Sequence, residues 1–295
     1  MSFSRLIRFR ADDGNVYFGE PEIAGGDQLE RELGQKTLFA TVLNGTSPFD
    51  LSPGSGEHKQ VEQILPILEA HDVPLVKCIG LNYFKHIQEG GRSPPPYPSV
   101  FTKAPTSVAP YNEAVSIPKL AQDDQLDYEG ELSLVIGKTG KNIDKKEALD
   151  YVAGYVVSND VSARKWQRDP KFAGAVPQWD FAKGFDSFAP LGPMLVSPKV
   201  VGNASNLCLQ TWVNDELRQD SNTSDLLFGV EAIVAFISYG TTIQTGTVVM
   251  TGTPAGVAMG MKPKPKYLND GDVVRVRIEH LRHDVTASRR YVDYK

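Results

Sequence analysis

The sequence predicts an α+β protein that is mainly β, with a small N-terminal α/β domain at residues 1–72 and a larger domain at residues 73–295. Three observations predict this organisation. The apolar runs are short and are separated by glycine, proline, serine and aspartate, which is typical of strands joined by turns. Few segments repeat apolar residues with helical spacing. The length of 295 residues is sufficient for one large domain or two.

Composition excludes several classes of protein. The chain is 41% hydrophobic and 23% charged, as is ordinary for a globular protein. A net charge of −5 argues against a nucleic acid or an anionic membrane as partner, and no apolar run approaches the ~20 residues of a membrane span. Cys78 and Cys208 are too few for a disulfide framework, which favours a reducing, intracellular compartment. Because strands are expected from residue 3 onward, we expect no signal or transit peptide and a cytoplasmic location.

The N-terminal domain is expected to begin with two strands within residues 3–18, joined by a turn at Asp13-Gly14. Turn residues at 52–56 and apolar residues at 64–68 complete this domain, which contains no evident chemistry. The boundary is expected near His71-Asp72, because the apolar segment 73–80 is typical of a buried strand.

Residues 80–97 have the composition of a mobile lid, with a short helical segment, the pair Gly90-Gly91 and a proline run. His86 and Glu89 are spaced i and i+3, so the carboxylate can orient or polarise the imidazole. A solvated surface pair would have the same spacing. Lys103 ends a predicted buried strand, where a structural ion pair is the alternative to a functional role.

The strand predicted at residues 128–137 organises the larger domain. Glu129 and Glu131 precede a wholly apolar run and, because side chains alternate along a strand, they point the same way from Cα atoms roughly 7 Å apart. Two carboxylates beside a buried segment repel each other and lose hydration unless a cation or a basic partner compensates. A hard metal ion is the simplest solution, and a half-exposed edge strand with two solvated glutamates is the alternative.

Further elements follow in order. Asp144 is expected to cap a short helix that ends at residue 152, and a buried strand at 154–160 ends in Asp160, which alone would most often be a cap. Lys183 lies among aromatic residues. Strands are expected at 208–213, 247–257, 273–278 and 285–292, with a sharp turn at Gly252. A helix is expected to begin near Ser224, with an apolar face formed by Val230, Ile233, Val234 and Ile237.

Four motifs occur in order along the chain: Gly80-Leu-Asn-Tyr-Phe-Lys-His86, Tyr128-Glu-Gly-Glu-Leu132, Asn159-Asp-Val-Ser-Ala-Arg164 and Thr251-Gly-Thr-Pro-Ala-Gly256. From about residue 73 to 290 the chain resembles the fumarylacetoacetate hydrolase superfamily, and residues 160–167 and 185–193 resemble its animal domain-containing protein 2 branch. The resemblance implies a catalytic domain with a mixed β-roll or sandwich, a homodimer and a bound Mg²⁺ ion, with Mn²⁺ as the alternative. It also makes a mitochondrial location the alternative to the cytoplasm.

The resemblance also implies which residues form the site. Glu129, Glu131 and Asp160 correspond to the metal ligands of the family, and an all-carboxylate set suits a hard octahedral ion. The implied catalytic residues are His86, Glu89 and Lys183, and the implied substrate-binding residues are Lys103, Arg164, Gln167 and Thr253. These residues would also supply the local positive charge that an acidic protein needs for an anionic ligand.

Three features depart from the family pattern. Lys165 stands where an acidic residue is common, the loop at 168–178 is longer than expected, and residues 279–283 replace a glycine-rich bend. The first two bear on which substrates fit the site.

The implied substrate is a small anionic 2-oxo dicarboxylic or β-diketo acid, which reacts through an enolate that the bound ion stabilises. The animal branch implies enol–keto tautomerisation of oxaloacetate. Loss of CO₂ would instead make the enzyme a decarboxylase, and activation of water by His86 would make it a hydrolase of acylpyruvates or fumarylacetoacetate-type substrates. A metal-dependent metabolite-binding protein without catalytic activity is the remaining alternative.

Overall fold

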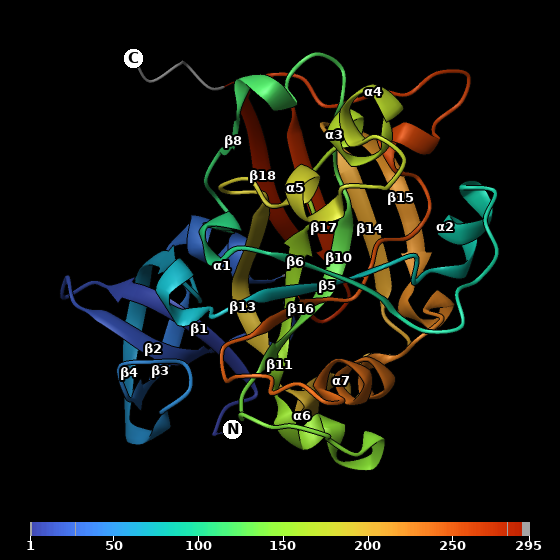
Figure 1. Cartoon of the computed structure of the whole chain (residues 1–295). Helices are drawn as coiled ribbons and strands as arrows, with labels where there is room; N and C mark the ends of the chain where they lie inside the picture. Colours follow the sequence, from blue (N-terminus) through green and yellow to red (C-terminus); the bar gives the residue numbers. More distant parts are fainter. Residues whose placement is uncertain (1, 27, 282, 291–295) are drawn as a thin grey trace.

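The computed structural model describes residues 2–26, 28–281 and 283–290, the last of these ranges by its main chain. The fold is α+β and mainly β, as predicted, and most of it is one large sheet and a second, smaller one (Figure 1). No helix in the described residues is both long enough and apolar enough to cross a membrane.

The larger sheet has 11 strands, and most of its neighbours are antiparallel. In spatial order its strands are β2 (Val16–Pro21), β3 (Phe39–Asn44), β4 (Ser52–Leu65), β1 (Arg5–Ala11), β13 (Ala189–Val196), β11 (Val152–Asn159), β10 (Gly130–Ile136), β16 (Val248–Met250), β5 (Val76–Gly80) and β6 (Ser99–Lys103), with β7 (Val108–Pro110) paired to β13.

The second sheet has five strands, in the order β15 (Glu216–Asn222), β14 (Cys208–Val213), β17 (Val273–Ile278), β18 (His283–Arg290) and β8 (Val115–Ile117). A separate pair consists of β9 (Leu126–Asp127) and β12 (Ser162–Ala163). The final strand predicted at 285–292 agrees with β18, except that residues 291 and 292 lie outside the described residues.

The helices are short. They are α1 (Gln28–Gln35), α2 (Phe84–Glu89), α3 (Arg164–Arg168), α4 (Pro170–Ala173), α5 (Trp179–Lys183), α6 (Pro198–Val201) and α7 (Val230–Ser238). Single 3₁₀ segments are η1 (Ala70–Asp72), η2 (Pro105–Ser107), η3 (Lys119–Ala121), η4 (Lys145–Tyr151), η5 (Thr223–Asp225) and η6 (Ala258–Gly260). The predicted cap is present, since the Asp144 side chain accepts a hydrogen bond from Lys146 N at the start of η4.

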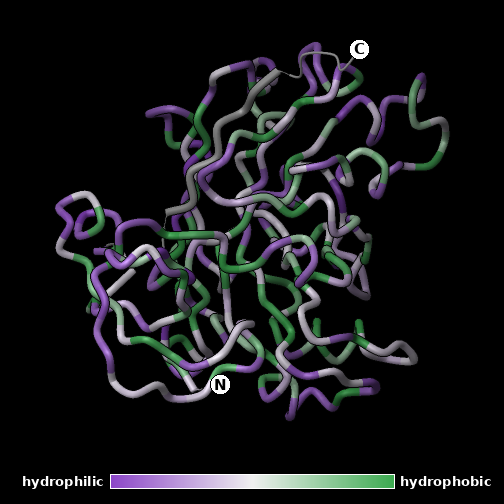
Figure 2. Tube along the Cα trace, turned by 90° about the vertical axis from the view of Figure 1, so that its left-hand side faces the viewer, coloured by the Kyte–Doolittle hydropathy of each residue, from purple (hydrophilic) through white to green (hydrophobic). Residues whose placement is uncertain are grey.

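Strand β10 lies within the larger sheet, and all of its residues are buried. It pairs with β11 on one side and with β16 on the other. Leu132, Leu134 and Ile136 pack into one hydrophobic cluster, whereas Val135 packs into a second cluster. Because successive side chains of a strand alternate between its faces, β10 forms part of both cores. Figure 2 shows hydrophobic segments along the inner strands and hydrophilic segments in many of the outer loops.

The N-terminal hairpin agrees with the sequence prediction. Strands β1 and β2 pair around a turn in which Gly14 has a φ of +82°, a conformation that glycine adopts without strain. Strand β1 also pairs with β13, through Leu6 and Leu195, so the N-terminal strands continue the larger sheet (Figure 1).

The start predicted for the helix near Ser224 is wrong, because Ser224 lies in η5 and α7 begins at Val230. The intervening residues form a bend that is hydrogen-bonded to Asn82. The main-chain N of Leu227 donates to Asn82 O at 2.7 Å, and the N of Phe228 donates to Asn82 Oδ1 at 2.9 Å. Local sequence contains no signal for this contact between residues far apart in the chain. The predicted apolar face is confirmed, since its four residues are buried.

Candidate metal centre and active site

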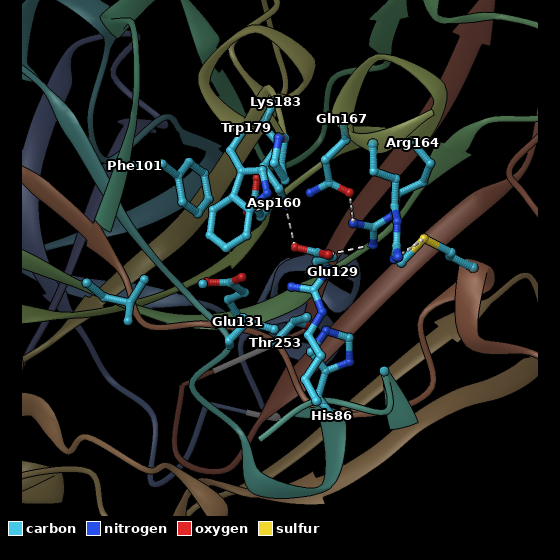
Figure 3. A pocket seen from close by; sticks show the side chains of 18 residues that line it. His86, Phe101, Glu129, Glu131, Asp160, Arg164, Gln167, Trp179, Lys183 and Thr253 are labelled. Carbon is cyan, nitrogen blue, oxygen red and sulfur yellow. Dashed lines mark hydrogen bonds and ion pairs between the residues drawn. The ribbon is translucent and has the colours of Figure 1, made fainter. Parts of the chain in front are cut away.

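The three acidic residues predicted as metal ligands come together in one buried cluster (Figure 3). Glu129 directly precedes β10, Glu131 lies within it, and Asp160 directly follows β11. The antiparallel register places Gly130 opposite Asn159, and Asp160 N donates to Glu129 O at 2.8 Å. One carboxylate oxygen from each residue lies within 4.8 Å of the others. The cluster therefore follows from strand alternation and from the pairing of β10 with β11.

Glu129 has two basic partners. Its Oε1 lies 2.5 Å from Arg164 Nη2, and its Oε2 lies 2.6 Å from Lys183 Nζ. Burial by itself raises the pKa of Glu129, but the charges of Arg164 and Lys183 outweigh burial and hold this pKa well below its usual range. Glu129 is therefore ionised at neutral pH.

Lys183 uses its ammonium group within the site. Besides Glu129, its Nζ donates to Asp160 Oδ2 and to Ser162 Oγ, both at 2.7 Å. Burial by itself lowers the pKa of Lys183, but Asp160 and Glu129 outweigh it and raise the pKa. Because an ammonium has three hydrogens, these three acceptors occupy all of its donors. Lys183 thus holds two of the three metal-site carboxylates together.

Lys103 lies on the other side of Asp160. Its Nζ is 2.5 Å from Asp160 Oδ1 and donates to Phe188 O, also at 2.5 Å. Its side chain is fully buried and does not line the cavity of the site. The structure thus places Lys103 behind the metal-site carboxylates, whereas the sequence analysis expected it to contact the substrate.

The negative charge of Glu131 is not compensated by a basic side chain within the described residues. Within the described residues no basic group lies within ion-pair distance of its carboxylate, and its Oε2 accepts one hydrogen bond, from Gly252 N at 2.7 Å. Burial and the charges of Asp160 and Glu129 raise the pKa of Glu131 well above its ordinary value. A divalent cation among the three carboxylates would remove this repulsion. The residues therefore fit a hard cation with oxygen ligands.

Arg164 forms the wall of the site next to Glu129. Its Nε donates to Asp127 Oδ2 at 2.8 Å, and its Nη1 donates to Gln167 Oε1 at 2.9 Å. Burial by itself lowers the pKa of Arg164, but the carboxylates of Asp127 and Glu129 outweigh it and raise the pKa. Asp127 also accepts hydrogen bonds from the main-chain N of residues 258 and 259. Arg164 is thus held in place by three side chains.

The predicted lid dyad is formed. His86 Nδ1 lies 2.9 Å from Glu89 Oε2, and both residues are on α2. Glu89 Oε1 also accepts a hydrogen bond from Gly256 N at 3.0 Å, which joins α2 to the turn after β16. A Cβ at Gly260 would lie 2.5 Å from the Glu89 carboxyl carbon, so a larger residue there would displace the Glu89 carboxylate. The segment predicted as a lid therefore contacts the turn after β16 through Glu89.

Thr253 lies at the sharp turn predicted after β16. Its hydroxyl donates to Gly130 O at 3.1 Å and accepts from Gln219 Nε2 at 2.8 Å. The preceding residue, Gly252, has a φ of +104°, and a Cβ there would lie 2.9 Å from Ile79 O. This turn directs Gly252 N at Glu131 and places Thr253 on the cavity wall.

One cavity unites most of the predicted site residues (Figure 3). The predicted residues that line it are His86, Glu129, Glu131, Asp160, Arg164, Gln167, Lys183 and Thr253. Lys103 and Glu89 are the predicted residues that do not, and both contact residues that do. Lys165 points elsewhere, because its Nζ donates to Asp123 O.

Sequence reasoning missed four residues of the site. Asp127 and Gln219 fix Arg164 and Thr253 from behind, and Arg92 and Arg168 line the cavity itself. One signal for Arg168 was present in the sequence, because residues 164 and 168 lie four apart and share a helix face. The other three residues have no local signal that separates them from surface or core polar residues.

The chain matches the family described as Fumarylacetoacetate (FAA) hydrolase C-terminal over residues 76–286. It belongs to this family, as the sequence motifs predicted. "Oxaloacetate tautomerase fahd2, mitochondrial" from Xenopus laevis is 44% identical over 204 residues, which cover 69% of this chain and 62% of that protein. "Fumarylacetoacetate hydrolase domain-containing protein 2 homolog" from Dictyostelium discoideum is 40% identical over 212 residues, covering 69% of this chain and 68% of that protein.

A solved structure extends the likeness to the whole fold. The 2-hydroxyhepta-2,4-diene-1,7-dioate isomerase from Mycobacterium marinum superposes with a TM-score of 0.78 at 29% identity, covering 99% of this chain and 100% of that one. The chain is therefore a member of an enzyme family whose named relatives include a tautomerase and an isomerase.

Proposed function

We propose that this protein is a magnesium-dependent enzyme that interconverts the enol and keto forms of oxaloacetate. The observation on which the proposal rests is that one cavity contains both a buried three-carboxylate cluster and a histidine held by a carboxylate. The names of the Xenopus relative, an oxaloacetate tautomerase, and of the mycobacterial structure, an isomerase, support this choice.

Glu129, Glu131 and Asp160 would hold the ion. Three carboxylates without histidine or cysteine favour Mg²⁺, with Mn²⁺ as the alternative. When bound, the ion would act as a Lewis acid toward the carboxylate and keto oxygens of a 2-oxo acid, which favours loss of a proton from C3. The protein's own contribution is to keep the three carboxylates converged, and Lys183, Lys103 and Arg164 do this by neutralising part of their repulsion.

His86 would move the proton at C3. Glu89 accepts from Nδ1, which assigns the ring hydrogen to that nitrogen and leaves Nε2 free to accept a proton. The negative charge of Glu89 then stabilises the imidazolium that forms. Delivering a proton to the C2 oxygen of the enolate gives the enol form, and delivering it to C3 gives the keto form.

Gln167 would contact the substrate directly. Its Oε1 accepts from Arg164, and its amide Nε2 makes no hydrogen bond within the described residues, so this donor remains for a substrate oxygen. The Thr253 hydroxyl and the Arg164 guanidinium already form hydrogen bonds within the protein, so we infer that they position Gly130 and Glu129.

Hydrolysis is the second candidate, and the His86–Glu89 dyad supports it as well. A histidine polarised by a carboxylate, as in His86 and Glu89, is also suited to activate water against a second carbonyl of an acylpyruvate. Decarboxylation of oxaloacetate and metabolite binding without catalysis are the further alternatives.

A single experiment separates these functions. Purified protein with Mg²⁺ is mixed with enol-oxaloacetate, and the enol absorbance and pyruvate formation are followed, with acetylpyruvate cleavage measured in parallel. Faster loss of enol absorbance without pyruvate is the expected result. Pyruvate release in step with enol loss would indicate a decarboxylase, cleavage of acetylpyruvate alone a hydrolase, and no acceleration of any reaction would refute a catalytic role.

The homodimer implied by the family resemblance stays a prediction, which sedimentation of the full chain would test. The cytoplasmic location also stays a prediction. The Xenopus relative is named mitochondrial, so fractionation of cells is the appropriate measurement.

A further inference from the structure

Two arginines line the active-site cavity at its exposed rim. Arg92 follows α2 and the pair Gly90-Gly91, and Arg168 is the last residue of α3. Both line the cavity, and both are exposed, whereas the other charged residues that line it are buried or nearly so. Within the described residues neither guanidinium forms an ion pair with a carboxylate. The rim therefore has two cations that the protein itself does not neutralise.

The two guanidinium groups are close enough to repel each other. Partial burial lowers the pKa of Arg168, and the positive charge of Arg92 lowers it further. Arg168 Nη1 is also held near Met259 Sδ, at 3.5 Å, on the cavity wall. Two neighbouring cations that both face one cavity favour an anion between them.

The region of the cavity around the metal-site carboxylates, here called its floor, has a different charge balance from the rim. The buried charged groups that line this region or lie directly behind it are four carboxylates and three cations, namely Asp127, Glu129, Glu131, Asp160, Lys103, Arg164 and Lys183. A divalent cation would leave this set with one excess positive charge, which a single substrate carboxylate would neutralise. Each basic group of the floor already contacts one or more carboxylates. A second substrate carboxylate would therefore find no unpaired cation on the floor.

The rest of the cavity lining is largely apolar. Phe101 and Trp179 line it with their rings 5.3 Å apart, edge to face, together with Ile79 and Pro177. These groups supply no partner for a carboxylate, so a charged substrate end is directed away from them.

We propose that Arg92 and Arg168 bind the second carboxylate of a dicarboxylic 2-oxo acid and so select dicarboxylic over monocarboxylic substrates. This inference rests on the proposed function and extends it to the residues that determine specificity. Arg92 lies on the same segment as His86, so binding of the distal carboxylate also favours the position of the proton-transfer residue.

Calorimetric titrations with Mg²⁺ present test the proposal with two probes. Oxalate has only the head group that the floor would bind. Difluorooxaloacetate chelates through a carboxylate and the adjacent keto oxygen, has a second carboxylate beyond this head, and has no C3 hydrogen to lose. We expect Arg92→Met and Arg168→Met each to weaken binding of difluorooxaloacetate about 10-fold or more, the order of one charge-assisted hydrogen bond, and to change oxalate affinity less than about 2-fold.

Lys171→Met is the matched control. This exposed cation lies on α4 close in sequence to Arg168 but does not line the cavity, so both affinities should stay at the wild-type value. All three positions are exposed, and unchanged melting temperatures would show that the variants fold.

Three results would overturn the proposal. Wild-type affinity for both probes in both arginine variants would make the arginines ordinary surface charges. Equal losses of affinity for oxalate and difluorooxaloacetate would indicate that the arginines attract anions in general and do not bind the second carboxylate. If the wild-type protein binds neither probe with Mg²⁺, the proposed function itself fails and the rim assignment fails with it.

Discussion

The replacement Glu131→Gln tests the metal centre most directly. Glu131 is 2% exposed, and its one hydrogen bond within the described residues comes from Gly252 N. Glutamine has the same size and keeps an oxygen that can accept this bond. The substitution therefore removes a charge without creating a cavity. What it removes is the one carboxylate of the cluster that has no basic partner.

The structure determines the sign of the effect in each condition. Without metal, Glu131 loses hydration and is repelled by Asp160 and Glu129, which is why its pKa is raised. Removing this charge should leave the melting temperature unchanged or raise it. With metal at 100 times its dissociation constant, the wild-type protein gains about 2.7 kcal/mol, which for a chain of this size corresponds to roughly 5 °C. Glu131→Gln loses a charged ligand, so most of this gain should disappear.

Thermal unfolding of EDTA-treated protein, with and without Mg²⁺, measures both effects. Glu113→Gln serves as the control, because Glu113 is exposed and lies outside the cluster. A Mg²⁺-induced shift as large as that of the wild type would exclude Glu131 as a ligand. A loss of more than about 1 kcal/mol of stability without metal would refute the argument from charge repulsion.

Three further predictions follow from contacts in the site and the core. Lys183→Met should destabilise the metal-free protein by about 3–5 kcal/mol, because two buried carboxylates lose a shared cation. The same variant should be stabilised more by Mg²⁺ than the wild type is, and a smaller Mg²⁺-induced rise in its melting temperature would contradict this. His86→Ala should slow enol-oxaloacetate conversion about 10²-fold or more, and Glu89→Ala should slow it less, since it only orients the base; wild-type rates in both variants would exclude the dyad. Cys78 is buried whereas Cys208 is partly exposed, so iodoacetamide at pH 8 should modify Cys208 first, as peptide mass spectrometry can show; preferential labelling of Cys78 in folded protein would contradict its burial.

The sequence alone determined the main elements of the site. Alternation along one strand was sufficient to place Glu129 and Glu131 on the same side, and the apolar run after them indicated that the strand is buried. The i, i+3 spacing of His86 and Glu89 was sufficient for a hydrogen-bonded pair on one helical turn. These features depend on near neighbours in the chain, which is why local patterns predicted them.

Tertiary structure alone decided which partner each charged group has. Lys183 was predicted as a catalytic residue that lines the site, and the fold decided that its three donors contact acceptors on two other segments. Lys103 was expected in the cavity, but it lies behind Asp160. The late start of α7 has the same origin, because Asn82 forms hydrogen bonds with Leu227 and Phe228, which precede it.

Arg92 and Arg168 show most clearly that local sequence does not reveal which distant residues share a site. They come from segments far apart in the chain, and the fold brings both to the cavity that contains the metal-site carboxylates. A side chain's hydrogen bonds and ion pairs depend on the groups within about 3–4 Å of it. When those groups belong to distant segments, the packing of the whole chain decides which of them meet.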